Sequence, residues 1–502
     1  MSSDEAAAPA GIRRNVLLAL AAQVTTGLFT AGLTLYLVRH FGPTSFGVFA
    51  LALGMGEIAF RIADLGIPFS TSRFLAERRR DGSAVAALLS DALRLKLVTS
   101  VAVAGALFAG AGLIASVYEK PALLWPLRAV AIAGLGQGVM MLYVSAFIGL
   151  GLMAINLRVF FLESLVETTA AAGLVLAGAG VTGATFGRAI GYVAGAAITL
   201  VVVWRLYGSR AFRRGTGGTG REIMRYAVPL FITNGTYTVY AQIDTLLVGG
   251  ILGTTAAGVF SAPLRLVIPL SYVGQAIANA VAPRQARGTG EEPNVAAFRT
   301  SLRWVLVFQS ALLAPLIVWP RPIVSLLFGQ PYTGSVEVLR VLSLFIFLRG
   351  AGPLITTTVN YLGRARQRIP IITGALAVNI VVDVTLLPWI GVVGGAVGAG
   401  VADLIYVPLH LWICKRELRF PVAPLALTLL RALLAAGAAA LVLLAFGTNH
   451  LSPGRWLLGA TLATVALVTV LVLSGEITPA ERRAGVSRVR RGFRKTLGVI
   501  RA

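Results

Sequence analysis

The sequence is short of charged residues, cysteine and histidine. Only 13% of its 502 residues are Asp, Glu, Lys or Arg, against about 25% in soluble domains. Its single cysteine, Cys414, excludes an intrachain disulfide and a cysteine-based metal cluster. The three histidines are widely separated, and no nucleophile stands with a base and a third polar group. We therefore expect no enzyme activity, no catalytic residues, no metal site and no cofactor.

Long apolar runs take the place of the missing charge. Apolar residues make up 57% of the chain, and they recur in runs of roughly twenty residues, the length at which a helix crosses a hydrocarbon core of about 30 Å. The runs are continuous rather than alternating, which favours helices over a transmembrane barrel. The sequence predicts an all-α integral membrane protein of about 14 transmembrane helices, near residues 15–38, 45–67, 92–116, 124–147, 157–178, 182–204, 225–248, 257–282, 300–319, 338–360, 369–388, 391–413, 424–446 and 455–474.

The positive charge is unevenly distributed between the connecting segments. The formal net charge is +24. With the N-terminus in the cytoplasm, 33 of the 44 Lys and Arg residues fall in cytoplasmic segments and six in external ones. Such a bias over short loops sets the orientation of a membrane protein. We therefore expect both termini in the cytoplasm, and the net charge does not indicate a nucleic-acid partner.

Parts of the sequence repeat at a spacing of 211 residues. Three pairs share this offset: residues 41–53 with 252–264, residues 180–187 with 391–398, and Arg73 with Arg284. Each copy holds six expected spans, an even number, so both copies have the same orientation in the membrane. The repeat predicts two six-helix lobes related by a pseudo-twofold axis along the membrane normal.

The repeat divides the chain into five parts. They are an N-lobe with helices 1–6 (residues 1–206), a glycine-rich cytoplasmic linker (207–222), a C-lobe with helices 7–12 (223–420), two extra helices, 13 and 14 (421–475), and a cytoplasmic tail (476–502). In the tail, apolar residues from Val486 to Ile500 recur at helical spacing, and basic residues cover the other faces. This pattern predicts an amphipathic helix lying on anionic membrane lipids. A disordered basic tail is the alternative.

Several short motifs occur in a fixed order along residues 12–420. They are Tyr36-Leu37-Val38-Arg39-His40-Phe41-Gly42, Phe46-Gly47-Val48-Phe49, Asp64-Leu65-Gly66, Tyr226-Ala227-Val228-Pro229-Leu230, Gln242-Ile243-Asp244, Gly258-Val259-Phe260-Ser261-Ala262-Pro263-Leu264-Arg265 and Leu387-Pro388-Trp389-Ile390-Gly391-Val392-Val393-Gly394-Gly395-Ala396. Together they resemble bacterial polysaccharide and lipid-linked oligosaccharide flippases, which belong to the multidrug/oligosaccharidyl-lipid/polysaccharide exporter superfamily.

The resemblance implies a fold and a function. Members of this family have two six-helix lobes around a central cavity that opens alternately to the two sides, and spans 1, 2, 7 and 8 line it. By resemblance, the protein is expected to export a lipid-linked oligosaccharide or polysaccharide repeat unit across the bacterial cytoplasmic membrane. We expect a monomer whose partners are this substrate and anionic lipids at the tail, and association with glycan-synthesis enzymes stays open.

Polar side chains in the expected spans mark a candidate cavity, because an arginine in a membrane costs at least about 2.5–3.5 kcal/mol and needs a partner or a wet surrounding. One face of the eighth span carries polar residues from Ser261 to Asn279, and it either lines a cavity or forms a polar helix interface. Arg61 stands between Glu57 and Asp64 on the second span, so these neighbours either neutralise it or form a ligand site with it. The candidate substrate-binding residues are Arg265, Arg61, Gln23, Tyr272, Gln275, Asn279 and Tyr237.

Acidic residues in the spans are candidates for coupling transport to an ion. Asp244 shares a helical face with Tyr237, and Asp383 follows Asn379 by four residues. The candidate ion-coupling residues are Asp244, Asp383, Glu57 and Asp64. These acids keep open a proton- or sodium-coupled drug or metabolite antiporter of the same superfamily. A membrane glycan polymerase is a further alternative, although the longest expected external loop, near residues 320–337, contains a single acid.

Overall fold

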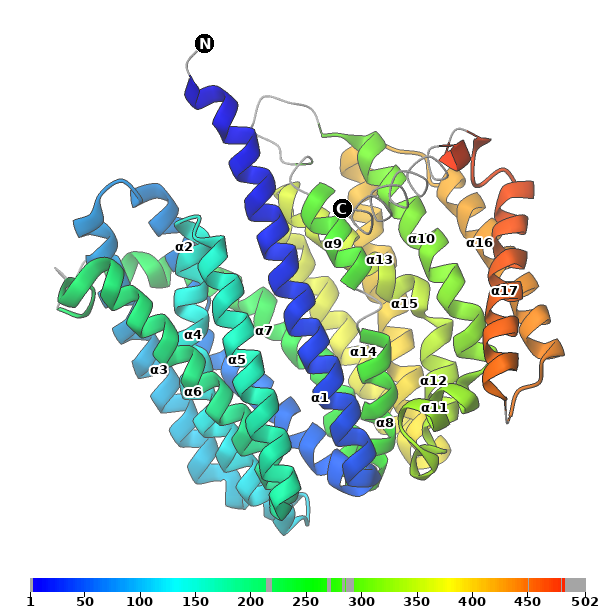
Figure 1. Ribbon diagram of the computed structural model, residues 1–502, viewed down its shortest axis with the longest axis horizontal. Coiled ribbons are helices and arrows are strands. Elements are labelled where there is room, and N and C mark those ends of the chain that lie inside the picture. The colour runs from blue at the N-terminus through cyan, green and yellow to red at the C-terminus, as the bar shows by residue number, and fades with distance from the viewer. Residues whose placement is uncertain are drawn as a thin grey trace, which may run out of the picture. The chain divides into compact units, whose positions relative to one another are not determined.

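The structure is a computed structural model that describes residues 3–213, 219–268, 272–281, 285, 293–449, 451–479 and 481–483. All regular elements in these residues are helical (Figure 1). The first long helices are α1 (Ser3–Asp64), α2 (Ile67–Arg78), α3 (Gly82–Val117), α4 (Leu124–Gly149), α5 (Met153–Leu174), α6 (Gly180–Tyr207), α7 (Thr219–Leu252) and α8 (Thr254–Val267). They are followed by α9 (Tyr272–Val281), α10 (Val295–Val318), α11 (Pro320–Leu327), α12 (Ser335–Leu344), α13 (Ile346–Tyr361), α14 (Arg368–Ile390), α15 (Val392–Leu418), α16 (Ala423–Ala445) and α17 (Pro453–Leu473).

The all-helical class is confirmed for the described chain, and helices cover most of each segment expected to span the membrane. The short helices α2 and α11 lie outside those segments, except for Ile67 at the start of α2. Nine helices in these residues are long and apolar enough to cross a membrane, or eleven if two bent pairs each count as one span. The count of fourteen stays a prediction. Within the expected linker, residues 208–212 form a 3-10 helix and residue 219 already begins α7, while 214–218 lie outside the described residues.

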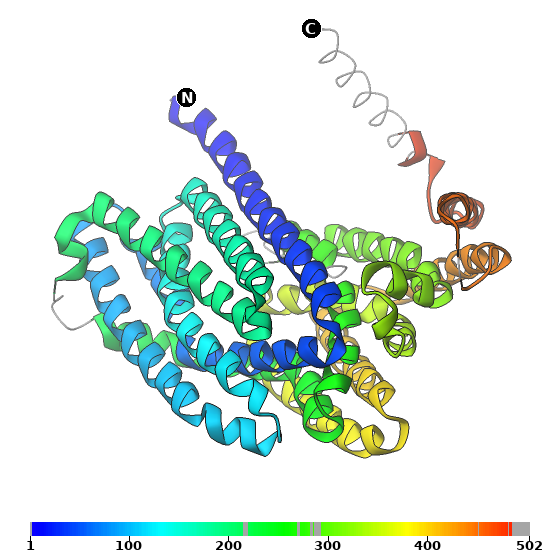
Figure 2. The same cartoon turned by 60° about the horizontal axis from the view of Figure 1, so that its bottom comes forward.

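Glycine breaks the helical path where the sequence predicts hairpins between spans. α1 is two helices merged across Gly42, whose φ of 67° and ψ of 172° are not helical. A positive φ of this kind favours glycine because it has no Cβ. Figure 2 shows the two blue segments of α1 running in different directions. Between α5 and α6, Gly178 (φ 88°) and Gly180 (φ 54°) interrupt the helix in the same way.

Equivalent turns of the two expected repeats have the same backbone geometry. Gly253 has φ 88° and ψ 175°, close to the values at Gly42, from which it is 211 residues distant. Gly391 has φ 63° and ψ −147°, close to φ 54° and ψ −139° at Gly180, again at this offset. The offset read from the sequence therefore pairs turns that are alike in three dimensions.

The turn at Gly42 and its equivalent at Gly253 contact each other, and the contacts are reciprocal. Thr44 Oγ1 lies 2.8 Å from Thr255 Oγ1, its equivalent in the repeat. A Cβ added to Gly47 would lie 1.7 Å from Thr254 O, and one added to Gly258 would lie 1.9 Å from Pro43 O. Gly47 and Gly258 are equivalent in the repeat, and so are Pro43 and Thr254. Each glycine therefore contacts the partner of the other, and such a pair of matching contacts means that a local twofold axis relates the two segments. The relation of the complete lobes stays a prediction.

The chain forms two compact units, each of which combines distant segments. The first holds Met1–Pro269, Leu327–Leu342 and Ala365–Tyr406. In it α3, α4, α5 and α6 pack side by side, as both views show. The core between them includes the buried side chains of Leu88, Tyr143 and Phe147. α4 and α6 approach closely because Gly136 lies where a Cβ would be 2.7 Å from the carbonyl carbon of Tyr192.

The second unit holds Leu270–Leu326, Ser343–Arg364 and Val407–Ala502. Its helices α16 and α17 form a hairpin that packs on α10 (orange and red in Figure 1). Trp319, which follows α10, is 1% exposed and contacts Trp456 with ring centroids 4.9 Å apart. Its indole Nε1 donates to the carbonyl oxygen of Gly447 over 3.0 Å. The polar edge of this large side chain is therefore satisfied where α16 ends.

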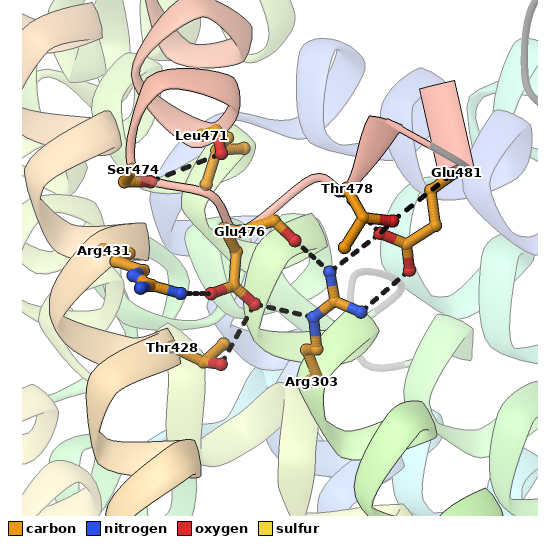
Figure 3. A network of polar contacts seen from close by, with 8 residues as sticks. All are labelled: Arg303, Thr428, Arg431, Leu471, Ser474, Glu476, Thr478 and Glu481. Atoms are coloured by element: carbon orange, nitrogen blue, oxygen red, sulfur yellow. Dashed lines mark hydrogen bonds and ion pairs between the residues drawn. The ribbon is translucent and has the colours of Figure 1, made fainter. Parts of the chain in front are cut away.

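A charged cluster ties the segment after α17 to two helices of the second unit (Figure 3). Glu476 is 2% exposed and accepts hydrogen bonds from Arg303 Nε (2.7 Å), Arg431 Nη1 (3.2 Å) and Thr428 Oγ1 (3.0 Å). Arg303 Nη1 also donates to Glu481 Oε1 over 2.8 Å. We call Arg303, Arg431, Glu476 and Glu481 the Glu476 cluster. Residues 484–502, which hold the predicted amphipathic helix, lie outside the described residues.

Candidate substrate and ion sites

The second segment of α1 carries a charged cluster in the first compact unit. Arg61 Nε donates to Thr238 Oγ1 of α7 over 3.1 Å, and Arg61 Nη1 lies 3.5 Å from Asp64 Oδ2. Lys96 of α3 forms an ion pair with the other oxygen of Asp64. Because Asp64 is shared between an arginine and a lysine, it cannot fully offset both charges. The contact with Asp64 that the sequence predicts for Arg61 is present, but α3 and α7 take part in it as well.

Lys96 is the member of this cluster that sequence reasoning missed. The sequence count assigns it to a cytoplasmic segment, whereas its side chain is 1% exposed. The long apolar stem of a lysine lets its ammonium reach a distant partner. The stem lies against α4, where a Cβ on Gly138 would be 2.9 Å from Lys96 Cε. The signal available in the sequence was the surplus of acid on α1, where Glu57 and Asp64 flank one arginine.

Arg188 of α6 joins acids from two other helices. Its Nη1 lies 3.1 Å from Glu167 Oε1 of α5, and its Nη2 lies 3.4 Å from Glu57 Oε1 of α1. Nη2 also donates to Tyr192 OH over 2.9 Å. The buried Nε has no hydrogen-bond partner among the described residues. Glu57 therefore pairs with an arginine from another helix, a contact that spacing along α1 does not reveal.

Arg265, near the C-terminal end of α8, lines a small cavity together with Arg188 and Glu167. The first segment of α1 contributes Thr30 and Thr34 to the same wall. A second small cavity is lined by Glu57, Phe60, Arg61, Ala63, Asp64, Lys96, Gly134, Gln137, Gly138 and Met141. Since Arg188 pairs with Glu57, a salt bridge joins the linings of the two cavities. The linings of the two cavities thus collect arginines, acids and hydroxyls from four helices, α1, α5, α6 and α8.

Asp244, Asn379 and Asp383 form a buried polar cluster between α7 and α14. Asn379 Nδ2 donates to Asp244 Oδ1 over 2.7 Å, and Asn379 and Asp383 are both fully buried. A Cβ on Gly398 of α15 would lie 1.9 Å from Asp383 Oδ1 and 3.1 Å from Asn379 Oδ1. Neither carboxylate oxygen of Asp383 receives a hydrogen bond from the described residues. A buried carboxylate in this state requires a proton or a cation.

The donor set limits what this cluster can hold. The described residues contain no group of three or more His, Cys, Asp or Glu suited to a metal ion. Two carboxylates and one amide oxygen instead match a proton or a weakly bound monovalent cation with oxygen ligands. The pairing of Asp244 with the residues around Asp383 comes from helix packing, which the separate patterns of the two spans do not predict.

Three tyrosines form an aromatic cluster beside these sites. The rings of Tyr240 and Tyr406 are stacked with centroids 5.5 Å apart, and that of Tyr237 lies 6.2 Å from Tyr240 and 6.3 Å from Tyr406. Tyr240 OH donates to Asp403 Oδ1 over 2.7 Å, and Arg368 Nη2 donates to Tyr406 OH over 3.2 Å. We call Tyr237, Tyr240 and Tyr406 the tyrosine cluster. Sequence analysis found Tyr237 but not the two residues that fix its neighbours, Arg368 and Asp403.

Four candidates from the sequence lie outside the clusters described above: Gln23, Tyr272, Gln275 and Asn279. Gln23 is exposed on α1 and lines neither of the two cavities. Tyr272 and Gln275 lie on α9 in the second unit, whereas Arg265 lies on α8 in the first. The side chain of Asn279 lies outside the described residues. Whether these residues share one face with Arg265 stays a prediction.

Two family models match the chain. Residues 12–288 match the model of polysaccharide biosynthesis proteins, and residues 172–467 match that of lipid II flippase MurJ. Among curated proteins, an uncharacterized membrane protein of Methanocaldococcus jannaschii is 20% identical over 183 residues. That alignment spans 36% of this chain and 43% of the relative.

Solved structures show the same fold. The chain is similar to lipid II flippase MurJ in an inward closed conformation, with a TM-score of 0.70 and 13% identity over 92% of this chain and 99% of the other. It is also similar to an inward-facing multidrug resistance transporter of the MATE family, with a TM-score of 0.65 and 15% identity over 80% and 99% of the two chains. The protein is therefore an integral, multi-pass membrane protein with the fold that MurJ and MATE transporters share. Because each family model covers more than half of the residues, the chain belongs to the polysaccharide biosynthesis and MurJ flippase family of transporters, within the superfamily that also contains the MATE transporters.

Proposed function

We propose that this protein exports a lipid-linked oligosaccharide or polysaccharide repeat unit across the bacterial cytoplasmic membrane by alternating access. The observation that carries the proposal is the cavity lined by Arg265 and Arg188, in a family of transporters for such substrates. Glu57 and Glu167 pair with Arg188, and Arg265 is a second arginine in the lining of this cavity. Thr30 and Thr34 add hydroxyl groups that suit a polar headgroup.

A diphosphate headgroup matches this arrangement. Its charge must lose water on entering the membrane, and arginine offers a planar set of donors that replaces the lost hydrogen bonds. Arg61, which hydrogen-bonds to α7, would add a second cation from the neighbouring cavity. An inside-negative potential also favours outward movement of such a headgroup by about 2.3 kcal/mol per charge per 100 mV.

The proposed transport cycle rests on fourteen spans in two six-helix lobes, residues 1–206 and 223–420, with helices 13 and 14 added at the C-terminus. The eleven candidate spans become fourteen if α1 is counted as two spans divided at Gly42, α5 and α6 are counted separately, and α7 is added. The positive-inside bias supports cytoplasmic termini. Single cysteines replacing Arg80 and Glu119 in a Cys414→Ser protein should then react with impermeant reagents from opposite sides. Reaction of both from the same side would refute this orientation.

We further propose that Asp244 and Asp383 couple export to a proton or a monovalent cation. Asn379 holds Asp244, while the two oxygens of Asp383 await a proton or a cation, so binding there would neutralise the buried charge. Glu57 and Asp64, the other ion-coupling candidates, are already paired with Arg188 and Lys96. This support is therefore stronger for Asp383 than for the acids of α1.

Arg265 provides the test of the export function. Arg265→Ala should abolish export and cause lipid-linked intermediate to accumulate, while protein abundance stays near normal. Arg265→Lys should keep part of the activity, because the charge remains but the planar set of donors is lost. Arg340→Ala is the matched control, since Arg340 pairs with Glu337 on the exposed surface of α12. Normal export by well-folded Arg265→Ala protein would rule out the proposed role.

The acidic cluster favours one alternative function, a cation-coupled drug or metabolite antiporter. The fold is shared with MATE transporters, and Asp244 and Asp383 would suit a cationic substrate as well as a coupling ion. In that case, cells that lack the protein should become sensitive to lipophilic cations and should show no accumulation of lipid-linked sugars. The opposite pattern is expected for the proposed flippase.

A further inference from the structure

Tyr237 lies deep within α7 and is nevertheless 48% exposed. α7 runs from Thr219 to Leu252, so Tyr237 is near its middle. Tyrosine in membrane proteins prefers the headgroup level, where its hydroxyl meets water. At the middle of a span, a half-exposed tyrosine on a face that also carries Asp244 is expected to face polar surroundings rather than acyl chains.

The two other rings of the tyrosine cluster are buried and fixed in position. Tyr240 is 9% exposed and Tyr406 is 5% exposed. Their hydroxyl groups are engaged by Asp403 and Arg368, respectively, which sets the orientation of each ring. Tyr237 therefore rests on a rigid aromatic base. A surface whose side chains are already ordered loses little entropy when it binds a ligand.

The exposed ring stands next to a group that suits phosphate. Thr238, the neighbour of Tyr237 in the chain, accepts the hydrogen bond from Arg61 Nε over 3.1 Å. Arg61 of α1 thus contacts α7 at the residue next to Tyr237. In a lipid-linked sugar, the first sugar ring is bonded directly to the phosphate. A substrate whose phosphate lies at Arg61 would consequently place that ring within reach of Tyr237.

We propose that Tyr237, supported by Tyr240 and Tyr406, is the subsite that stacks against the phosphate-linked sugar ring of the substrate. The face of an aromatic ring carries partial negative charge, and one face of a pyranose presents C–H groups with partial positive charge, so the two faces attract each other. This inference rests on the proposed export function and adds to it the position of the sugar. A cationic ligand would also suit an aromatic face, so the binding test includes one.

Binding to two lipids that differ only in the sugar tests the proposal. The probes are a polyprenyl diphosphate that carries one N-acetylhexosamine and the same polyprenyl diphosphate without sugar. The full-length protein in nanodiscs should bind the glycosylated lipid more tightly. Tyr237→Leu should weaken binding of the glycosylated lipid roughly 3- to 10-fold and leave binding of the sugar-free lipid unchanged. Tyr237→Phe and Tyr237→Trp, which keep an aromatic face, should retain the preference for the sugar.

Controls separate the failure of this inference from failure of the proposed function. Tyr361→Leu removes a tyrosine that is 42% exposed at the end of α13, and it should change neither affinity. Binding of neither lipid to the unmodified protein would overturn the export function itself. Equal binding of both lipids, or a preference that survives Tyr237→Leu, would overturn only the stacking subsite. Loss of tetraphenylphosphonium binding in Tyr237→Leu, with the sugar preference intact, would identify a cation site instead.

Discussion

The Glu476 cluster in the second unit and the charges around Arg188 in the first unit use the same residue types but differ in how fully they are satisfied. Arg303 donates from Nε, Nη1 and Nη2 to two carboxylates and a backbone carbonyl oxygen. Arg188 also meets two carboxylates, yet its buried Nε has no partner among the described residues. The residues of the first unit additionally line small cavities.

This difference separates charges that hold a fold from charges that await a ligand. A buried ion pair stabilises a protein only when its hydrogen bonds are complete, because dehydration of both charges is costly. The Glu476 cluster meets this condition and fastens the segment after α17. The sites of the first unit do not meet it, and Asp383 is the clearest case. We infer that substitutions should damage stability in the second unit and transport in the first.

The largest effect is expected for Glu476→Ala. This change leaves Arg303 and Arg431 without their shared carboxylate and should destabilise the protein by about 3–5 kcal/mol, so little folded protein should reach the membrane. Thermal unfolding in detergent, followed by size-exclusion chromatography, measures the loss. Glu337→Ala is the matched control, because its pair with Arg340 is exposed; its cost should stay below about 1 kcal/mol. Equal stability of the two variants would break the comparison.

Asp383→Asn should give the opposite result, with a stable protein that no longer couples export to an ion. Asparagine keeps the shape of the side chain and removes a buried charge that has no donor, so stability should stay within about 1 kcal/mol of the parent. Export should lose its dependence on sodium or on pH. Asp81→Asn provides the control, since Asp81 caps α3 by accepting from Ser83 N and Ala84 N, a role that asparagine also fills. Destabilisation by Asp383→Asn as strong as that by Glu476→Ala would make this cluster structural.

Sequence patterns predicted the helices and the positions of the repeated glycine turns, but not the contacts between helices. Apolar runs depend on local composition, and the glycine turns at Gly42 and Gly253 recur because the same positive φ is needed twice. Contacts between helices depend on packing, which single spans do not encode. Glu57 was therefore paired with Arg61 on its own helix, although Arg188 reaches it from α6. Lys96 was missed for a related reason, since its ammonium lies far from its own backbone position.

The smallest effect concerns the edge of the Glu476 cluster. Hydrogen bonds from Arg303 lower the pKa of Glu481 to about 2. The pKa of Glu476 is also lowered, because hydrogen bonds from Arg303, Thr428 and Arg431 outweigh the effect of burial, which raises it. Glu481 is 29% exposed, so Glu481→Gln should cost only about 1 kcal/mol at neutral pH.

The pH dependence of that cost identifies its origin. A carboxylate with a lowered pKa in the folded protein stabilises it above the pKa of the unfolded chain, about 4.3, and this contribution disappears as the pH falls towards 2. The difference in stability between the parent and Glu481→Gln should thus be constant from pH 6 to pH 8 and should shrink below about pH 4. Glu476 is present in both proteins, so its own titration largely cancels in the difference. If the difference in stability between the parent and Glu481→Gln is unchanged at pH 3, packing of the Glu481 side chain provides the stabilisation, rather than the attraction between its charge and Arg303.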